Sequence, residues 1–309
     1  MPLPLTPPIA PQLARSREQL PDGDGWAYEP KWDGFRTIAF VDGHEIYLQS
    51  RGGKDLTRYF PEVTLPAGRY VIDGELLAES FGVLNQRIHP AESRINRLSK
   101  EIPARFIAFD LLAEDDELLL GLPYRERRAR LESLTSRLGI ELTPVAYDTA
   151  GAARWLDEEE GVVAKELDGA YRPGERKGMA KIKRLRTADA VLVGWRPGKA
   201  EGTVGALILG MYEPDGRLRV IGHNSGLKAK EKRELPAILA PFETGERGSG
   251  DPSRWTGNKD LEWVALRPEL VVEVAYDQVS DGRIRHGTKL LRWRTDKAPA
   301  ECTVDQLDN

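Results

Sequence analysis

The sequence predicts an α+β protein of two domains, the first with mixed strands and helices and the second smaller and rich in strands. Its 309 residues suffice for two domains of ordinary size. In the first part, segments with the two-residue period of strands lie between segments with helical spacing. After about residue 187 short strand-like segments dominate. We therefore place the domains at residues 1–186 and 187–309.

The elements of the first part follow from periodicity and turn residues. Residues 36–49 alternate apolar and polar around Asp42-Gly43, which is typical of a hairpin turn. A helix is predicted over 123–138, because leucines recur at helical spacing and a glycine follows. The prolines at the start of the chain indicate an extended arm. The remaining expected elements are strands at 69–78, 105–112, 161–166 and 180–184, and a short helix at 151–159.

The second part has the pattern of a small β-barrel, which short strands with one helical insertion suit. The residues from 244 to 260 are rich in glycine, serine and charge, so we expect a loop there. The expected elements are strands at 189–195, 204–213, 217–223, 270–277 and 289–294, and a helix at 227–240.

Composition excludes several classes of protein. No apolar run approaches the roughly 20 residues that cross a bilayer. The N-terminus lacks the basic and apolar regions of a secretory signal. Cys302 is the single cysteine, which excludes an internal disulfide and a multi-cysteine zinc site. A cytosolic location is the default expectation for such a chain.

The formal charge of −4 is weak evidence against a nucleic-acid partner. Charge is unevenly distributed, however, and the run from Arg172 to Arg186 contains a single acid, Glu175. Because salt screens charges over about 8 Å, such a local strip can bind phosphates within an acidic protein. A solvated surface explains the run equally well at this stage.

Lys31 is the strongest catalytic candidate. The chain has no GxxxxGK(S/T) phosphate-binding loop. If the protein is a nucleotide enzyme, other residues must therefore bind the phosphates. In the segment KWDGFR, Lys31 could be a nucleophile once its amine is neutral, which costs roughly 4–5 kcal/mol at pH 7. A metal held by Asp33, and the charge of Arg36, would both lower this cost. Alone, so short a motif also fits a surface loop.

Two strands of the first part carry further candidates. Asp73 and Glu75 share one face of a strand by its two-residue period, although two solvated acids on an edge strand would give the same pattern. Phe109 follows in an apolar strand. It fits the core of the protein as well as it fits a platform for a stacked base.

Two segments near the end of the first part combine charge with apolar residues. Glu160 precedes a strand in which Val163 and Lys165 share a face. Lys181 and Lys183 also share a face, and like charges so placed suggest a phosphate between them, unless the strand is simply solvated.

Taken in order, these segments resemble the nucleotidyltransferase motifs of ATP-dependent DNA ligases. The motifs are KWDGFR at 31–36, SRGGKD at 50–55, DGE at 73–75, FDLL at 109–112, EGVVAK at 160–165, KIK at 181–183 and RWRTDK at 292–297. Each is short, but the ordered set spans nearly the whole chain. Met179-Ala180 departs from the pattern, because the family usually has Trp-Leu before the paired lysines.

Further segments resemble the short bacterial ligases of the end-joining type, namely ligase C and the ligase domain of ligase D. They are PPIAPQLA near the start, RIHPAESR at 87–94, GALILGMY at 205–212 and LRWRTDKAPAECTVDQL at 291–307.

The resemblance implies a role for each candidate. Lys31 would attack the α-phosphate of ATP and carry AMP as a covalent adduct. Adenine would be read by Glu29 and the backbone around Pro30, and would lie between Phe109 and Val163. The other implied contacts are those of Glu75 with the ribose, of Arg36 and Arg51 with the ribose or phosphates, of Asp33 and Glu160 with Mg²⁺ or Mn²⁺, of Lys165, Lys181 and Lys183 with the AMP phosphate, and of Arg292, Arg294, Asp296 and Lys297 with pyrophosphate in the first step.

The resemblance also implies an adenylation domain of mixed, mainly antiparallel sheets with helices at 1–186, and an OB-fold domain at 187–309. The activity would be the sealing of nicks or breaks in double-stranded DNA, with DNA-repair or end-joining proteins as candidate partners. We expect a hinge at Thr187 to Asp189, because the last motif must approach Lys31 and then withdraw. We further expect a monomer in the bacterial cytoplasm, associated with the nucleoid and not with a membrane. We expect no DNA-binding domain upstream of Lys31, and hence salt-sensitive DNA binding.

Two other functions compete with this one. An RNA ligase or mRNA capping enzyme would share the lysine chemistry, but the RWRTDK run and the end-joining segments favour DNA. A nick-binding protein without catalysis is disfavoured because each motif retains its chemically required residue. An NAD-dependent ligase would need a four-cysteine zinc module, which Cys302 alone cannot form.

Overall fold

The computed structural model describes residues 3–183, 186–248, 262–277, 279–280, 282–284 and 287–307. The chain divides into two compact units, Met1–Arg184 and Leu185–Asn309. No helix in the described ranges combines the length and apolarity that a membrane crossing requires.

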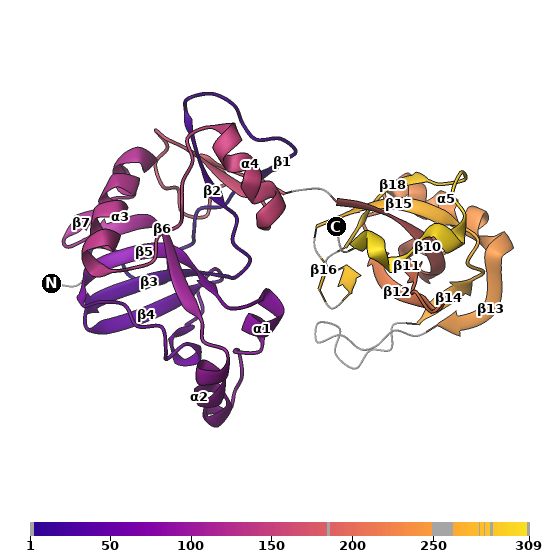
Figure 1. Ribbon diagram of the computed structural model, residues 1–309, viewed down its shortest axis with the longest axis horizontal. Coiled ribbons are helices and arrows are strands. Elements are labelled where there is room, and N and C mark those ends of the chain that lie inside the picture. Colours follow the sequence, from indigo (N-terminus) through magenta and orange to yellow (C-terminus); the bar gives the residue numbers. More distant parts are fainter. Residues whose placement is uncertain are drawn as a thin grey trace. The chain divides into compact units, whose positions relative to one another are not determined.

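The first unit is built on a five-stranded antiparallel sheet in the order β4-β3-β5-β6-β7 (Figure 1). Its strands are β3 (Phe35–Gly43), β4 (Glu45–Ser50), β5 (Gly68–Leu77), β6 (Arg105–Glu114) and β7 (Glu117–Leu118). The hairpin around Asp42-Gly43 and the strands predicted at 69–78 and 105–112 are therefore confirmed.

Helix α3 (Tyr124–Leu138) lies across this sheet (Figure 1). Leu131 and Leu134 pack into the same apolar cluster as Leu76 and Leu111 of the sheet. The helix ends at Gly139, which has a φ of +70° and so takes the left-handed conformation that glycine favours. The predicted helix at 123–138 is confirmed.

A four-stranded sheet in the order β1-β9-β8-β2 completes the first unit. Helix α4 (Thr149–Glu158) covers one face, where its Trp155 packs with Tyr28, Ala164 and Ile182 of the sheet. The strands are β1 (Arg15–Arg17), β2 (Trp26–Pro30), β8 (Val162–Glu166) and β9 (Met179–Ile182). β1 runs parallel to β9, whereas β8 is antiparallel to both of its neighbours.

Five strands and helices of this unit were not expected from the sequence: β1, β2, β7, α1 (Phe81–Asn85) and α2 (Glu92–Glu101). Strand β2 is buried at Ala27, Tyr28, Glu29 and Pro30 in succession, so it shows no polar alternation that would reveal it. The two helices lie between β5 and β6 and are short, so each offers few turns in which a helical period could be recognised.

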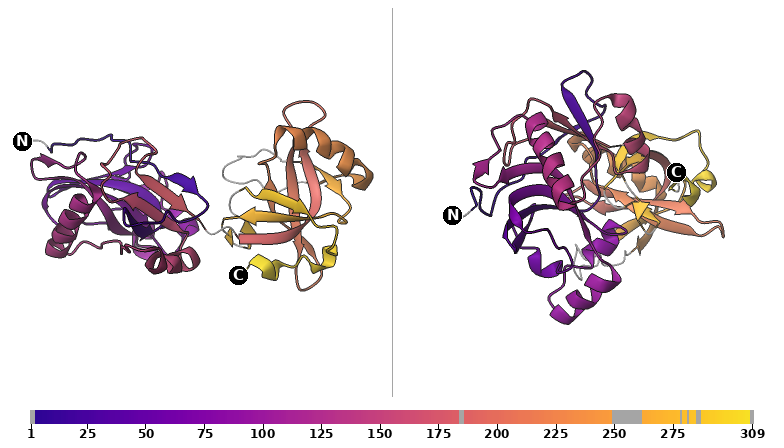
Figure 2. Two further views of the ribbon diagram at one scale, coloured as in Figure 1. Left: turned by 90° about the horizontal axis from the view of Figure 1, so that it is seen from above. Right: turned by 60° about the vertical axis from the view of Figure 1, so that its left-hand side comes forward.

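The second unit consists mainly of a curved antiparallel sheet around one apolar cluster, as the orange-to-yellow strands of Figure 2 show. β10 pairs with β11 on one side and with β15 and then β14 on the other, and its register shifts between Leu192 and Gly194. The elements are β10 (Arg186–Pro197), β11 (Val204–Tyr212), β12 (Leu218–Asn224), α5 (Ala229–Leu239), β13 (Glu243–Gly248), β14 (Trp263–Leu266), β15 (Val271–Tyr276), β16 (Val279–Ser280), β17 (Arg283–Ile284) and β18 (Lys289–Trp293). Short 3₁₀ helices occur at Thr57–Tyr59, Ala240–Phe242, Pro299–Glu301 and Val304–Leu307.

Two expectations for the second part were wrong. The loop predicted over 244–260 begins instead as the exposed strand β13, whose charged residues hide its strand character; residues 249–260 lie outside the described ranges. The hinge predicted at Thr187 to Asp189 lies inside β10, where each residue pairs with β15. A strand held by its ladder cannot absorb the backbone rotation that a hinge requires.

Candidate active site

Lys31 follows directly after β2, and its backbone N–H donates to the carbonyl oxygen of Gly161 at 2.9 Å. Gly161 precedes β8 with a φ of +141°, and a Cβ there would lie 2.1 Å from the carbonyl oxygen of Ile182 in β9. Only glycine therefore lets these three strands approach one another so closely. This packing fixes the backbone of Lys31 beside the start of β8.

Glu160 places its carboxylate between two lysines as a consequence. It accepts a hydrogen bond from Lys31 Nζ, and its other oxygen lies 2.6 Å from Lys183 Nζ. The Glu160 side chain is only 7% exposed, while the side chains of Lys31 and Lys183 are 20% and 21% exposed. Lys31 and Lys183 therefore both pair with the Glu160 carboxylate, in a site that is partly exposed to solvent.

The surroundings of Lys31 make its neutral form more accessible than that of an ordinary lysine. Burial, and next the charge of Lys183, lower the pKa of Lys31 from 10.5 to about 8, although Glu75 and Asp33 act in the opposite direction. At pH 7 about one such amine in ten is neutral, against about three in ten thousand at the ordinary pKa. Burial also raises the pKa of the Glu75 carboxyl to about 8, against the opposing charges of Arg36 and Lys31.

Arg36 is fixed by a buried network. Its Nε and Nη2 lie 3.1 and 2.7 Å from the two carboxylate oxygens of Asp73, which is fully buried. The Tyr171 hydroxyl donates to Asp73 at 2.6 Å, and Arg36 Nη1 donates to the carbonyl oxygen of Gln12 at 2.6 Å. The guanidinium also lies 5.4 Å from the centre of the Phe109 ring. The cation is therefore held rigidly at the edge of the predicted base platform.

Lys165 is buried at the other end of β8. Its Nζ lies 2.8 Å from Glu29 Oε2 and donates to the carbonyl oxygen of Phe109 at 2.8 Å. The side chains of Lys165 and Glu29 are both 3% exposed. The hydroxyl of Tyr124 donates to Glu29, and Arg128 Nη1 lies 3.5 Å from it. The Glu29 carboxylate is thus largely committed to protein partners.

The remaining predicted residues of the first unit lie in three places. Val163 is half-buried and pairs with Glu29 across β2 and β8. Asp33 and Lys181 are near enough to Lys31 to shift its pKa. Arg51 is exposed in the turn after β4 and is not among the charges that most strongly shift the pKa of Lys31.

The predicted residues of the last motif form their own cluster in the second unit. Arg294 Nη1 lies 2.8 and 2.9 Å from the carboxylate oxygens of Asp189, and its Nε and Nη2 lie 2.9 Å from those of Asp296. Lys297 Nζ lies 2.8 Å from Asp189, and Arg292 Nε lies 2.5 Å from Glu273. Asp189 therefore organises two cations of the motif.

Tyr124, Arg128 and Tyr171 take part in these networks but were not expected from the sequence. The leucine stripe of α3 was a usable signal, because helical spacing backwards from Leu131 leads to Arg127, Arg128 and Tyr124 on the buried face. No comparable signal points to Tyr171, which lies in the irregular β8–β9 loop.

Known families match both units. The family model of the ATP dependent DNA ligase domain matches residues 7–183, and that of the ATP dependent DNA ligase C terminal region matches residues 200–297. DNA ligase C1 of Mycolicibacterium smegmatis is 45% identical over all of this chain and 96% of its own length. The multifunctional end-joining protein LigD of Mycobacterium tuberculosis is 34% identical over 89% of this chain and 37% of its own length.

Solved structures agree with these matches. Mycobacterial DNA ligase D complexed with ATP and MES is 31% identical, with a TM-score of 0.52, over 96% of this chain and 98% of that one. A Lig E DNA ligase structure has a TM-score of 0.60 at 19% identity over 92% of this chain and 99% of that one, which supports the fold alone.

Proposed function

The chain belongs to the family of ATP-dependent DNA ligases, and we propose that Lys31 is the residue through which this enzyme carries AMP from ATP to DNA. The fold is that of the family, a nucleotidyltransferase domain followed by an OB-fold domain. The observation that supports the role of Lys31 most directly is the Glu160 carboxylate between Lys31 and Lys183, in a site that lowers the pKa of Lys31 to about 8.

In the first step, neutral Lys31 Nζ attacks the α-phosphorus of ATP. The N–P bond forms while the bond to the leaving pyrophosphate breaks, so charge builds up on phosphate oxygens. Glu160 orients the amine through its hydrogen bond, and Lys183 and Lys181 supply positive charge beside the phosphate. Glu29, Pro30, Phe109 and Val163 surround the place proposed for adenine, with Glu75 and Arg36 at the ribose.

A divalent cation would add positive charge at the α-phosphate when bound, and we propose Asp33 and Glu160 as its ligands. Hard oxygen donors suit Mg²⁺ or Mn²⁺, and Glu160 already faces two ammonium groups. No group of three or more acidic, His or Cys side chains that could hold a metal occurs within the described ranges. The protein would thus supply few ligands, as is usual for Mg²⁺ that also contacts phosphates and water.

AMP then passes from Lys31 to the 5′-phosphate of a nick, and the 3′-hydroxyl displaces AMP as the backbone closes. We propose nicked double-stranded DNA as the substrate and DNA-repair or end-joining proteins as partners, because relatives include proteins named for non-homologous end joining. Arg51 is proposed to act on phosphate, and Arg292, Arg294, Asp296 and Lys297 on pyrophosphate in the first step.

Labelling with α-labelled ATP and magnesium tests the role of Lys31. We expect label on the denatured chain of the unchanged enzyme and of Lys100→Ala, a control on exposed α2, but not on Lys31→Ala. Lys31→Ala should nevertheless seal nicks whose 5′-phosphate already carries AMP, because the later steps do not need its amine. Stable label on Lys31→Ala, or no sealing of nicked DNA by the unchanged enzyme, would reject the proposal.

A further inference from the structure

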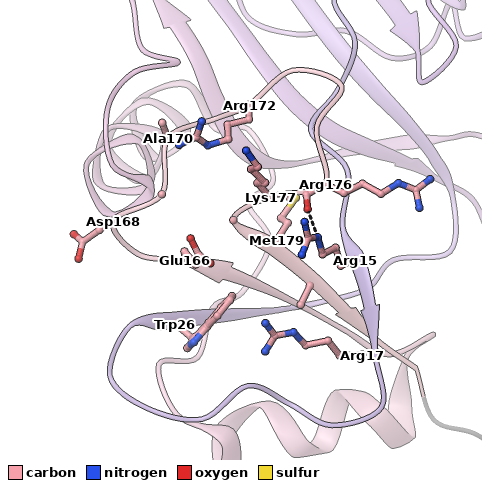
Figure 3. Close-up of a pocket in the computed structure, with 13 residues that line it drawn as sticks. Arg15, Arg17, Trp26, Glu166, Asp168, Ala170, Arg172, Arg176, Lys177 and Met179 are labelled. Atoms are coloured by element: carbon pink, nitrogen blue, oxygen red, sulfur yellow. Dashed lines mark hydrogen bonds between the residues drawn. The ribbon is translucent and has the colours of Figure 1, made fainter.

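A basic hollow of about 410 Å³ opens at one end of the four-stranded sheet, apart from the site around Lys31 (Figure 3). β1 contributes Arg15 and Arg17, and the start of β2 contributes Trp26. The end of β8, the β8–β9 loop and the start of β9 contribute the rest of the wall. The charged residues of the lining are Arg15, Arg17, Arg172, Arg176 and Lys177, with the acids Glu166 and Asp168. Cations thus predominate here in a chain whose formal charge is −4.

The acids do not neutralise these arginines. Asp168 pairs with Arg125, outside the hollow, at 2.5 Å, and Lys177 pairs with Glu175 at 3.6 Å. Within the part of the chain that the structure describes, no carboxylate lies within ion-pair distance of Arg15, Arg17, Arg172 or Arg176. All four arginines are exposed. The hollow therefore presents positive charge that the fold leaves available to an anion.

The side chains of the basic hollow lie on a different face of the sheet from the nucleotide site. Arg15 and Arg17 lie beside Ala180 and Ile182 in the β1–β9 ladder, so their side chains share the face that α4 covers. Lys181 points to the opposite face, toward Lys31. Arg17 is also held in place, since its guanidinium lies 5.4 Å from the centre of the Trp26 ring. These arginines are consequently unsuited to the ATP phosphates.

The form of the hollow favours an extended polyanion over a small one. A site for a free nucleotide encloses its ligand and aims a few buried polar groups at it, whereas these cations are exposed and come from separate elements. Arginines spread over an open surface match the phosphates along a nucleic-acid strand. We propose that this hollow binds the sugar–phosphate backbone of duplex DNA away from the nick. The inference depends on the proposed function, because it assumes a DNA substrate.

The test compares two double variants in the full chain. Arg17→Ala with Arg172→Ala removes two lining cations, neither of which makes a hydrogen bond that the fold requires. Arg130→Ala with Arg137→Ala removes the same charge from the exposed side of α3. Binding of a labelled nicked duplex is measured by anisotropy at several salt concentrations without ATP.

We expect the hollow variant to bind several-fold more weakly at low salt. Its plot of log affinity against log salt should be shallower by about 1–2, because each phosphate contact contributes about 0.9 to the slope. The α3 variant should keep the slope of the unchanged enzyme. An unchanged slope in the hollow variant, or an equal change in both variants, would overturn the proposal. So would a loss confined to single-stranded DNA.

Labelling of Lys31 by ATP provides the folding control, since none of the residues that line the hollow belongs to the proposed nucleotide site. The hollow variant should be labelled as fast as the unchanged enzyme. If the unchanged enzyme binds nicked DNA but is never labelled, the proposed function fails while the salt comparison still decides the role of the hollow.

Discussion

Lys165 Nζ lies 2.8 Å from Glu29 Oε2, in a pair whose side chains are both 3% exposed. The resemblance to ATP-dependent DNA ligases implied different roles for these residues, Lys165 at the AMP phosphate and Glu29 at adenine. In the structure they form one buried ion pair, which is completed by Tyr124 and the carbonyl oxygen of Phe109. A buried charge that loses its partner is strongly destabilising, so this pair can be tested by stability as well as by activity.

We expect Lys165→Met to lower the free energy of unfolding by about 3–5 kcal/mol, because Glu29 stays buried and charged with only the more distant Arg128 as a cationic partner. Adding Glu29→Gln should restore much of that loss, since the unpaired charge is then gone. Urea unfolding of the single and double variants measures both effects. A Lys165→Met protein of normal stability that is slow to adenylate would instead support a phosphate contact.

The rate of adenylation should depend on pH through Lys31. Only the neutral amine attacks phosphorus, so at saturating ATP the rate should rise about tenfold per pH unit below pH 8 and level off above it. Lys183→Met should move the midpoint to higher pH, because the charge of Lys183 lowers the pKa of Lys31. Single-turnover labelling between about pH 6 and pH 10 gives the profile. A rate that is flat across pH 8 would show that Lys31 deprotonation does not limit the step.

Gly161→Ala should both destabilise the first unit and abolish adenylation. The added Cβ would lie 2.1 Å from the carbonyl oxygen of Ile182, at a φ of +141°, so we expect a loss of about 3 kcal/mol or more. Gly139→Ala is the matched control: its φ is +70°, but no atom lies within 4 Å of the added Cβ, so strain alone should cost about 1–2 kcal/mol. Thermal unfolding compares the two, and equal losses would show that the close strand approach is unimportant.

Asp189→Asn should slow the first step selectively. Asp189 holds both Arg294 and Lys297, so weakening its charge frees the cations proposed to act on pyrophosphate. We expect about tenfold slower adenylation, which corresponds to roughly 1.4 kcal/mol, with normal sealing of nicks that already carry AMP. Glu269→Gln, which releases Arg267 outside the motif, serves as the control. If both reactions slow equally, Asp189 supports the fold of the second unit and not the first step.

The sequence was informative where periodicity or motif order determines the answer. Alternation identified the hairpin of β3 and β4, an apolar run identified β6, and the ordered motifs indicated the family. Whether each proposed site residue has its assigned role stays a prediction, although Lys31, Glu160 and Lys183 do converge.

The sequence did not predict which residue a buried side chain contacts or how deeply that side chain lies. The two-residue period of a strand predicts the face from which the Lys165 side chain projects. It does not predict that the ammonium group forms a buried ion pair with Glu29. The residue pattern changes near Thr187 to Asp189, which suggested a domain boundary with a hinge. In the structure these residues belong to β10 and pair with β15. Pairing between distant segments is a property of the folded chain, and a single sequence does not encode it as a local pattern.

The first residues of the chain have a practical consequence for protein engineering. β1 closes one edge of the four-stranded sheet, and the backbone of Gln12 accepts the hydrogen bond that fixes Arg36. Trimming the gene to begin at residue 18 would remove that edge together with the backbone carbonyl that holds Arg36. A purification tag is therefore best attached ahead of Ile9 through a spacer, so that this segment can still dock as it does here.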